Sequence, residues 1–140
     1  MYKRIQNLTT VLLLSAFLAL AVPLGAHCAD TESFIRAESV VLTKVNGTIN
    51  GPSGKETYYN LNMSNVIRLM RDLGYSAEEY PYWVRDDGVK MFGPYVMVAA
   101  NLVIRPRGTI VQTSLGKGIV VDTGEFAKYD TTQIDIAVTW

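Results

Sequence analysis

The chain has 140 residues, with 13 lysines and arginines against 13 aspartates and glutamates, and with one cysteine and one histidine. Every acidic residue lies from Asp30 onward, whereas the bases Lys3 and Arg4 precede it, so residues 30–140 carry 13 acidic against 11 basic side chains. This slightly acidic balance gives poor support to a nucleic-acid partner, and the lack of histidine and cysteine after Cys28 excludes a Cys/His zinc site, a disulfide framework and imidazole-based catalysis from that part of the chain.

The N-terminal segment has the three parts of a secretory signal. Basic Lys3 and Arg4 precede an apolar run over residues 11–22, which ends at Pro23 and is followed by small residues. The run is shorter than the roughly 18 to 20 residues that span a bilayer, which disfavours a retained membrane anchor. We expect residues 1–29 to be a cleaved signal peptide, and the protein to be secreted and extracytoplasmic.

The residues at the end of this segment leave the cleavage position open. Ala26 and Cys28 fit the small-residue positions before a cut, and a cut after Ala29 fits as well. Lipid attachment at Cys28 is disfavoured because His27 stands where a small residue is expected.

A polar linker over residues 30–39 is expected to lead into one domain over residues 40–140, a length that supports a single modest core. β-Branched residues over 40–49, interrupted by an Asn-Gly pair, predict a strand, a turn and a second strand. The cluster of turn residues over 50–54 separates them from a further strand over 57–61.

One helix is predicted over residues 64–73. Ser64 can cap its first amides, Gly74 can end it in the left-handed conformation, and apolar residues recur at helical spacing between them. Met63 and Met70 are interpreted as core side chains.

After the helix the pattern is β throughout. A turn at Asp86-Asp87-Gly88 predicts a hairpin, and four more strands are predicted: 95–102, 110–113, 119–122 and 134–140. Several short strands with one helix and no long parallel crossover indicate a mainly β fold, a small barrel that the last strand closes.

Three motifs in the second half of the domain share their order and spacing with a known family. Residues 98–109 form a strand that leads into Arg-Pro-Arg-Gly-Thr, residues 120–124 end a strand in Asp-Thr-Gly, and residues 133–136 contain Ile-Asp. This pattern resembles the 3D-type domain of membrane-bound lytic transglycosylases and of secreted 3D-domain proteins. The resemblance implies a six-stranded double-psi β-barrel with one short helix.

The resemblance also implies a catalytic site. The family has three aspartates, of which this chain keeps Asp122 and Asp135, while Asn101 occupies the first position. Asp135 corresponds to the acid implied to do the chemistry, and Asp122 is expected to raise its pKa as a neighbouring carboxylate. Two simpler interpretations remain open: Asp122 caps the turn that follows it, and Asp135 points to solvent.

Four residues are expected to bind substrate: Asn101, Thr123, Lys55 and Tyr58. The implied partner is the glycan strand of peptidoglycan, the implied location is the cell wall, and the implied activity is lytic-transglycosylase-type cleavage with no cofactor, no metal and no membrane contact after signal cleavage. The alternative is a barrel of the same fold that binds cell-wall glycan without cleaving it, which the replacement of the first acid by Asn101 favours.

Overall fold

The structure is a computed structural model that describes residues 40–140. The predicted signal peptide over residues 1–29 and the predicted linker over residues 30–39 lie outside the described residues. Within the described part, no helix is long and apolar enough to cross a membrane.

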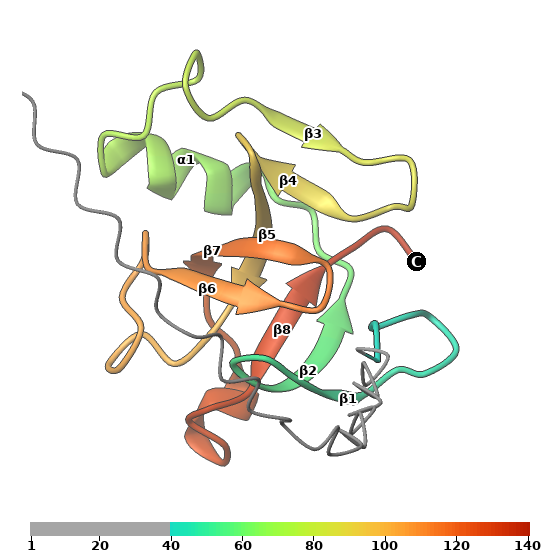
Figure 1. The fold of residues 1–140 in the computed structure, drawn as a ribbon. Coiled ribbons are helices and arrows are strands. Elements are labelled where there is room, and N and C mark those ends of the chain that lie inside the picture. The colour runs from blue at the N-terminus through green and yellow to red at the C-terminus, as the bar shows by residue number, and fades with distance from the viewer. Residues whose placement is uncertain (1–39) are drawn as a thin grey trace, which may run out of the picture. The chain divides into compact units, whose positions relative to one another are not determined.

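Residues 40–140 are mainly β with one α-helix, as the sequence predicts at this coarse level (Figure 1). The α-helix is α1 (Ser64–Asp72), and a short 3₁₀ helix, η1 (Glu125–Lys128), precedes the last strand. The strands are β1 (Ile49–Gly51), β2 (Gly54–Tyr59), β3 (Tyr82–Val84), β4 (Lys90–Phe92), β5 (Tyr95–Ala99), β6 (Ile110–Thr113), β7 (Gly116–Asp122) and β8 (Ile134–Ala137).

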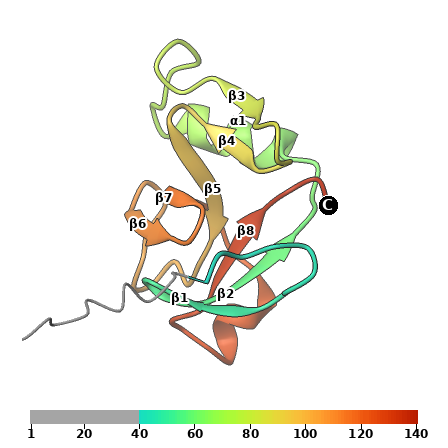
Figure 2. The same cartoon turned by 45° about the vertical axis from the view of Figure 1, so that its right-hand side comes forward.

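All eight strands belong to one mixed sheet. Its main path runs β1-β2-β8-β5-β4-β3, and β7 pairs with β5 on one side and with β6 on the other. Two of the pairs are parallel, β2 with β8 and β5 with β7, and the other pairs are antiparallel. The last strand, β8, therefore lies inside the sheet between β2 and β5, and Figures 1 and 2 show β2 and β8 side by side.

Side chains connect β6 to the β1–β2 hairpin, with which it has no ladder in residues 40–140. The amide of Gln112 donates to the Ser53 hydroxyl at 3.1 Å. The amide and hydroxyl of Ser114 donate to the carboxyl of Glu56, the hydroxyl at 2.6 Å. The Arg105 guanidinium adds a bond to the Ser53 carbonyl at 2.7 Å. These contacts hold two edges of the sheet against each other without backbone pairing.

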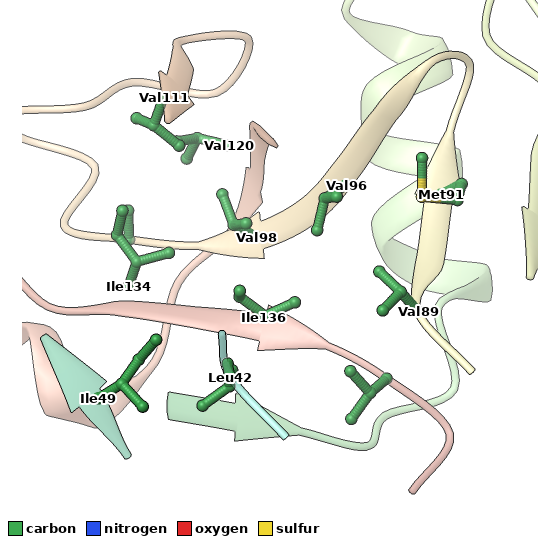
Figure 3. Close-up of a cluster of buried hydrophobic side chains, with 12 residues drawn as sticks. Leu42, Ile49, Val89, Met91, Val96, Val98, Val111, Val120, Ile134 and Ile136 are labelled. Carbon is green, nitrogen blue, oxygen red and sulfur yellow. The ribbon is translucent and has the colours of Figure 1, made fainter. Parts of the chain in front are cut away.

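Alternation along the strands divides the apolar side chains into two buried clusters. In β5, Val96 and Val98 belong to the first cluster and Met97 to the second. Figure 3 shows the first cluster, which gathers side chains from β4, β5, β6, β7 and β8 together with Leu42. The second cluster lies under α1 and contains Met63 and Met70, which confirms both methionines as core residues.

Helix α1 ends as predicted and begins differently. Gly74 has a φ of +95°, and the amides of Gly74 and Tyr75 donate to carbonyls of the last turn, which ends the helix. The N-cap residue is Met63, and its side chain makes no capping hydrogen bond. The predicted cap at Ser64 is therefore wrong. Instead the Ser64 amide donates to Oδ1 of Asn62 at 3.0 Å.

Three predicted strand segments are shorter in the structure, and the one predicted over 134–140 ends at Ala137. Of residues 40–49 only the end belongs to a strand, because Val40 and Val41 are exposed and the segment pairs with no other strand. The strand predicted over 95–102 ends at Ala99, since the Asn101 side chain accepts the amide of Val103 and turns the chain. The hairpin around Asp86-Asp87-Gly88 is confirmed as β3 and β4.

Candidate functional site

The sheet register places the two predicted catalytic acids on either side of one alanine. Ala99 of β5 pairs with Asp122 of β7 and with Asp135 of β8. The register between β5 and β7 shifts by one residue between Val98 and Ala99, which brings Asp122 opposite Ala99. Residues in register on adjacent strands point to the same face, so both carboxyl groups project from the face that also carries α1. The ends of β7 and β8 thus meet through β5.

Tyr59 joins this pair from a third strand. Thr57 pairs with Asp135, and Tyr59, two residues further along β2, lies on the same face. The Tyr59 hydroxyl donates to Oδ2 of Asp122 at 3.3 Å. Burial, the charge of Asp122 and its hydrogen bond, and then the charge of Asp135, all raise the pKa of the Tyr59 phenol. The phenol therefore stays protonated and acts as a donor to Asp122.

Asp135 is half-buried and has a defined set of neighbours. The buried amide of Gln133 donates to Oδ1 of Asp135 at 3.2 Å and to the Thr57 hydroxyl at 3.0 Å. Burial raises the pKa of the Asp135 carboxyl, while the hydrogen bond from Gln133 and the charge of Lys55 oppose that rise. The net direction is upward, which is the direction that a general acid requires. Asp135 remains partly exposed, and the hydrogen bond from Gln133 ties its carboxyl to the start of β8.

The physical cause of the raised pKa differs from the one expected. The sequence interpretation assigned it to repulsion from Asp122, whereas in the structure burial is the cause. One strand lies between the two acids, so their Cα atoms are about 10 Å apart, two strand spacings. At that separation the charge of Asp122 reaches Asp135 only weakly. Asp122 instead accepts the Tyr59 phenol, which is a different role from capping the turn after β7.

Asn101 and Thr123 line a neighbouring cavity of about 460 Å³, together with Gly124, Glu125 and Lys128. The amide of Asn101 donates to the Ala127 carbonyl at 2.9 Å, and its oxygen accepts the Val103 amide at 2.9 Å. Asn101 therefore shapes the cavity by holding η1 to the loop after β5. It makes no described hydrogen bond to either acid.

Lys55 and Tyr58 lie on opposite sides of β2. Lys55 is exposed and shares the face of Thr57. Its charge opposes the rise in the pKa of Asp135 and contributes to the lowered pKa of Asp130. Tyr58 points to the other face, where its ring packs on Trp140 with centroids 4.6 Å apart and its hydroxyl is 3.5 Å from the Lys44 carbonyl. Alternation therefore directs Tyr58 away from the two acids, and its predicted role in substrate binding stays a prediction.

Tyr59 and Gln133 are the site residues that the sequence interpretation missed. Alternation from Thr57 was the available signal for Tyr59, because it places every second residue of β2 on one face. For Gln133, the signal was its position two residues before Asp135 at the start of a strand. Among residues 40–140, no group of three or more histidine, cysteine or acidic side chains is placed to hold a metal ion.

The chemistry available here is proton transfer by carboxyl groups. One half-buried carboxyl with a raised pKa, one carboxyl bound to a phenol, and a cation at the margin lie on one face of the sheet. No protein-family model, no curated protein and no solved structure matches this chain. Its function is therefore inferred from the site itself.

Proposed function

We propose that this protein is a secreted cell-wall protein that cleaves the glycan strands of peptidoglycan with Asp135 as general acid and base. The observation that carries the proposal is the position of Asp135. Its carboxyl is half-buried with a raised pKa, and Asp122 and Tyr59 lie on the same face of the sheet. Glycosidic cleavage needs a carboxylic acid that is still protonated near neutral pH, and burial moves Asp135 in that direction.

The proposal includes a double-psi β-barrel of the 3D type. Two features support it: the parallel pairs β2 with β8 and β5 with β7, and the side-chain contacts between Ser53 or Glu56 and the β6 region. The three sequence motifs that suggested the family lie on β5 and the loop after it, on the end of β7, and on β8. Each motif therefore contributes to the region around Ala99.

In the proposed reaction Asp135 donates its proton to the glycosidic oxygen as the bond from that oxygen to the anomeric carbon breaks. The resulting Asp135 carboxylate then takes the proton of the sugar's own 6-hydroxyl, whose oxygen forms a new bond to the anomeric carbon. The proton count on Asp135 is restored, and no water is consumed. Tyr59 holds Asp122 in place by donating its phenolic hydrogen.

The cavity lined by Thr123, the residue after Asp122, is where the sugar units would bind. Thr123 is exposed and Asn101 half-exposed at its wall, and both are polar groups of the kind that orient sugar hydroxyls. Lys55 lies close enough to Asp135 to influence it electrostatically and can receive an anionic substituent of the wall polymer. These three residues are the proposed binding groups.

The test is a zymogram with purified bacterial wall, comparing wild type, Asp135→Asn and Asp130→Asn. Asp130 is a matched control, because it lies in the same loop-to-strand region and its carboxyl accepts hydrogen bonds from Thr132 and Gln133 that asparagine can keep in part. Clearing is expected from wild type and Asp130→Asn. Asp135→Asn should lose activity by about 10² to 10⁴-fold, the usual contribution of general acid–base catalysis. Equal clearing by Asp135→Asn would show that another group does the chemistry.

A glycan-binding role without cleavage is the second candidate. It is favoured by Asn101, which stands at the first acid position of the family pattern and commits its amide to the Ala127 carbonyl. This candidate predicts that wild type sediments with insoluble wall but clears no zymogram. Sedimentation should then weaken on Thr123→Val, which keeps the shape of the side chain and removes its hydroxyl.

A further inference from the structure

A lysine lies buried on the same side of the sheet as α1, away from the two acids. Lys90 of β4 is 5 % exposed, and its ammonium donates to Oδ1 of Asn60 and to the Leu61 carbonyl, both at 2.7 Å. The Asn60 amide in turn donates to the Thr139 carbonyl at 3.1 Å, which fixes the orientation of its oxygen. The acceptors of Lys90 are thus a side-chain amide and a peptide carbonyl.

The charge of Lys90 is not balanced by these neutral acceptors. Within residues 40–140 no carboxylate lies within salt-bridge distance of its ammonium. Burial of an ammonium without a counter-ion is costly, and here burial alone lowers the pKa of Lys90. An ammonium has three donors, and two of them are used by Asn60 and Leu61.

Lys90 lines a polar cavity of about 440 Å³ that the first turn of α1 also lines. Its wall includes Asn62, Ser64 and Tyr82 in addition to Lys90 and its two acceptors. The first turn of α1 contains no acidic side chain, and the Asn62 side chain accepts the Ser64 amide, so the other free amides at the positive end of the helix face this region.

We propose that this cavity binds a carboxylate group, with the Lys90 ammonium as its counter-ion. One full charge on Lys90 and about half a charge at the helix N-terminus match a monoanion better than a doubly charged phosphate. The site shares no residue with the region around Asp135, and it does not depend on glycan cleavage. The ligand is therefore a molecule that presents a single carboxylate to this cavity.

The test uses sodium acetate as the probe on the ¹⁵N-labelled full-length chain, with sodium chloride at equal ionic strength as the reference. Acetate should produce saturable amide shifts in the segment around Asn62 and Ser64 and at Lys90, and chloride should not. Shifts that grow linearly and match those of chloride would overturn the proposal, and this measurement needs no variant. Tighter binding of inorganic phosphate than of acetate would overturn the assignment to a carboxylate.

Three variants sharpen the result. Lys90→Met should abolish the saturable shifts, whereas Lys117→Met, which removes an exposed lysine of β7, should leave them unchanged. Asn62→Asp keeps an oxygen for the Ser64 amide and places a carboxylate at the cavity, so it should weaken acetate binding at least about threefold by competition. If acetate binding is unchanged both in Asn62→Asp and in Lys90→Met, Lys90 is not the counter-ion.

Discussion

The approach of Gly51 to Glu56 gives a quantitative test of how the edge of the sheet is held. A Cβ atom added at Gly51 would lie 2.0 Å from Oε1 of Glu56, 2.2 Å from its Cδ and 2.6 Å from its Cγ. Glu56 has no exposed surface, and both of its oxygens accept hydrogen bonds from Ser114. The side chain therefore has no free direction in which to move, and Gly51→Ala must displace it.

The cost of this substitution has two parts. Overpacking in a buried region costs about 1 to 3 kcal/mol, and a buried donor that loses its acceptor, here the Ser114 amide, costs about 1 to 3 kcal/mol. We expect Gly51→Ala to lower the free energy of unfolding by about 2 to 6 kcal/mol, the sum of the two parts. The matched control is Gly47→Ala, where φ is +57° and nothing lies within 4 Å of the added Cβ, so that only backbone strain of about 1 to 2 kcal/mol applies.

A double-mutant cycle separates the clash from the other effects. Glu56→Ala alone should be destabilising because it leaves Ser114 without its acceptor, but in its presence Gly51→Ala should cost almost nothing more. Urea unfolding of the two single variants and the double variant should give a coupling energy of about 2 to 6 kcal/mol. Additive effects, within the roughly 0.5 kcal/mol typical of independent sites, would refute the contact between Gly51 and Glu56.

Two further predictions concern the acids and the phenol. The folded state raises the pKa of Asp135, so the protonated form of Asp135 favours folding below about pH 4, and this contribution is lost as the pH rises through the raised pKa. The stability of Asp135→Asn relative to wild type should therefore increase with pH. Urea midpoints between pH 3 and 7 can measure this change. Asp130→Asn should show the opposite trend, because hydrogen bonds from Thr132 lower the pKa of Asp130 in the folded state. The same pH trend in both variants would contradict the environment assigned to Asp135. Tyr59→Phe removes the hydrogen-bond donor to Asp122. Hydrogen bonds to charged groups contribute about 1.5 to 3 kcal/mol, so wall clearing should fall about tenfold or more. A dilution series of the zymogram measures this loss. Tyr58→Phe, which changes a hydroxyl on the other face of β2, should clear as wild type does, and an equal loss in both variants would indicate a general effect on β2.

Local signals in the sequence predict the ends of those helices and strands that have turn residues directly beside them. β6 spans the predicted residues because turns flank it on both sides, and α1 ends where Gly74 adopts its positive φ. The prediction of two strands over residues 40–49 was wrong for most of that range, because local signals alone do not make a strand. β-Branched side chains favour a strand only where another strand offers a ladder, and Val40 and Val41 have none.

The candidate site was predictable in its residues and not in its connections. The motifs pointed to Asp122 and Asp135, but their meeting on one face depends on β5 lying between β7 and β8, which is a long-range pairing with no local signal. The same limit applies to Tyr59, since alternation gives the face on which it lies and not the strand that it reaches. The cause of the raised pKa of Asp135 was also beyond the sequence, because burial is a property of the packed sheet.

The position of the proposed catalytic groups depends on contacts at the far edge of β2. Thr57 and Tyr59 face the acids, while Glu56, the residue before Thr57, points to the other side and is held by Ser114 after β6. A shift of β2 by one residue would exchange these two faces, placing a carboxyl among the acids and the phenol in the opposite cluster. The buried bonds of Glu56 disfavour that shift, because a carboxyl with defined donors fits one register only. Ser114 therefore positions Tyr59 beside Asp122 although it touches neither, and the cost of Gly51→Ala should appear in wall clearing as well as in stability.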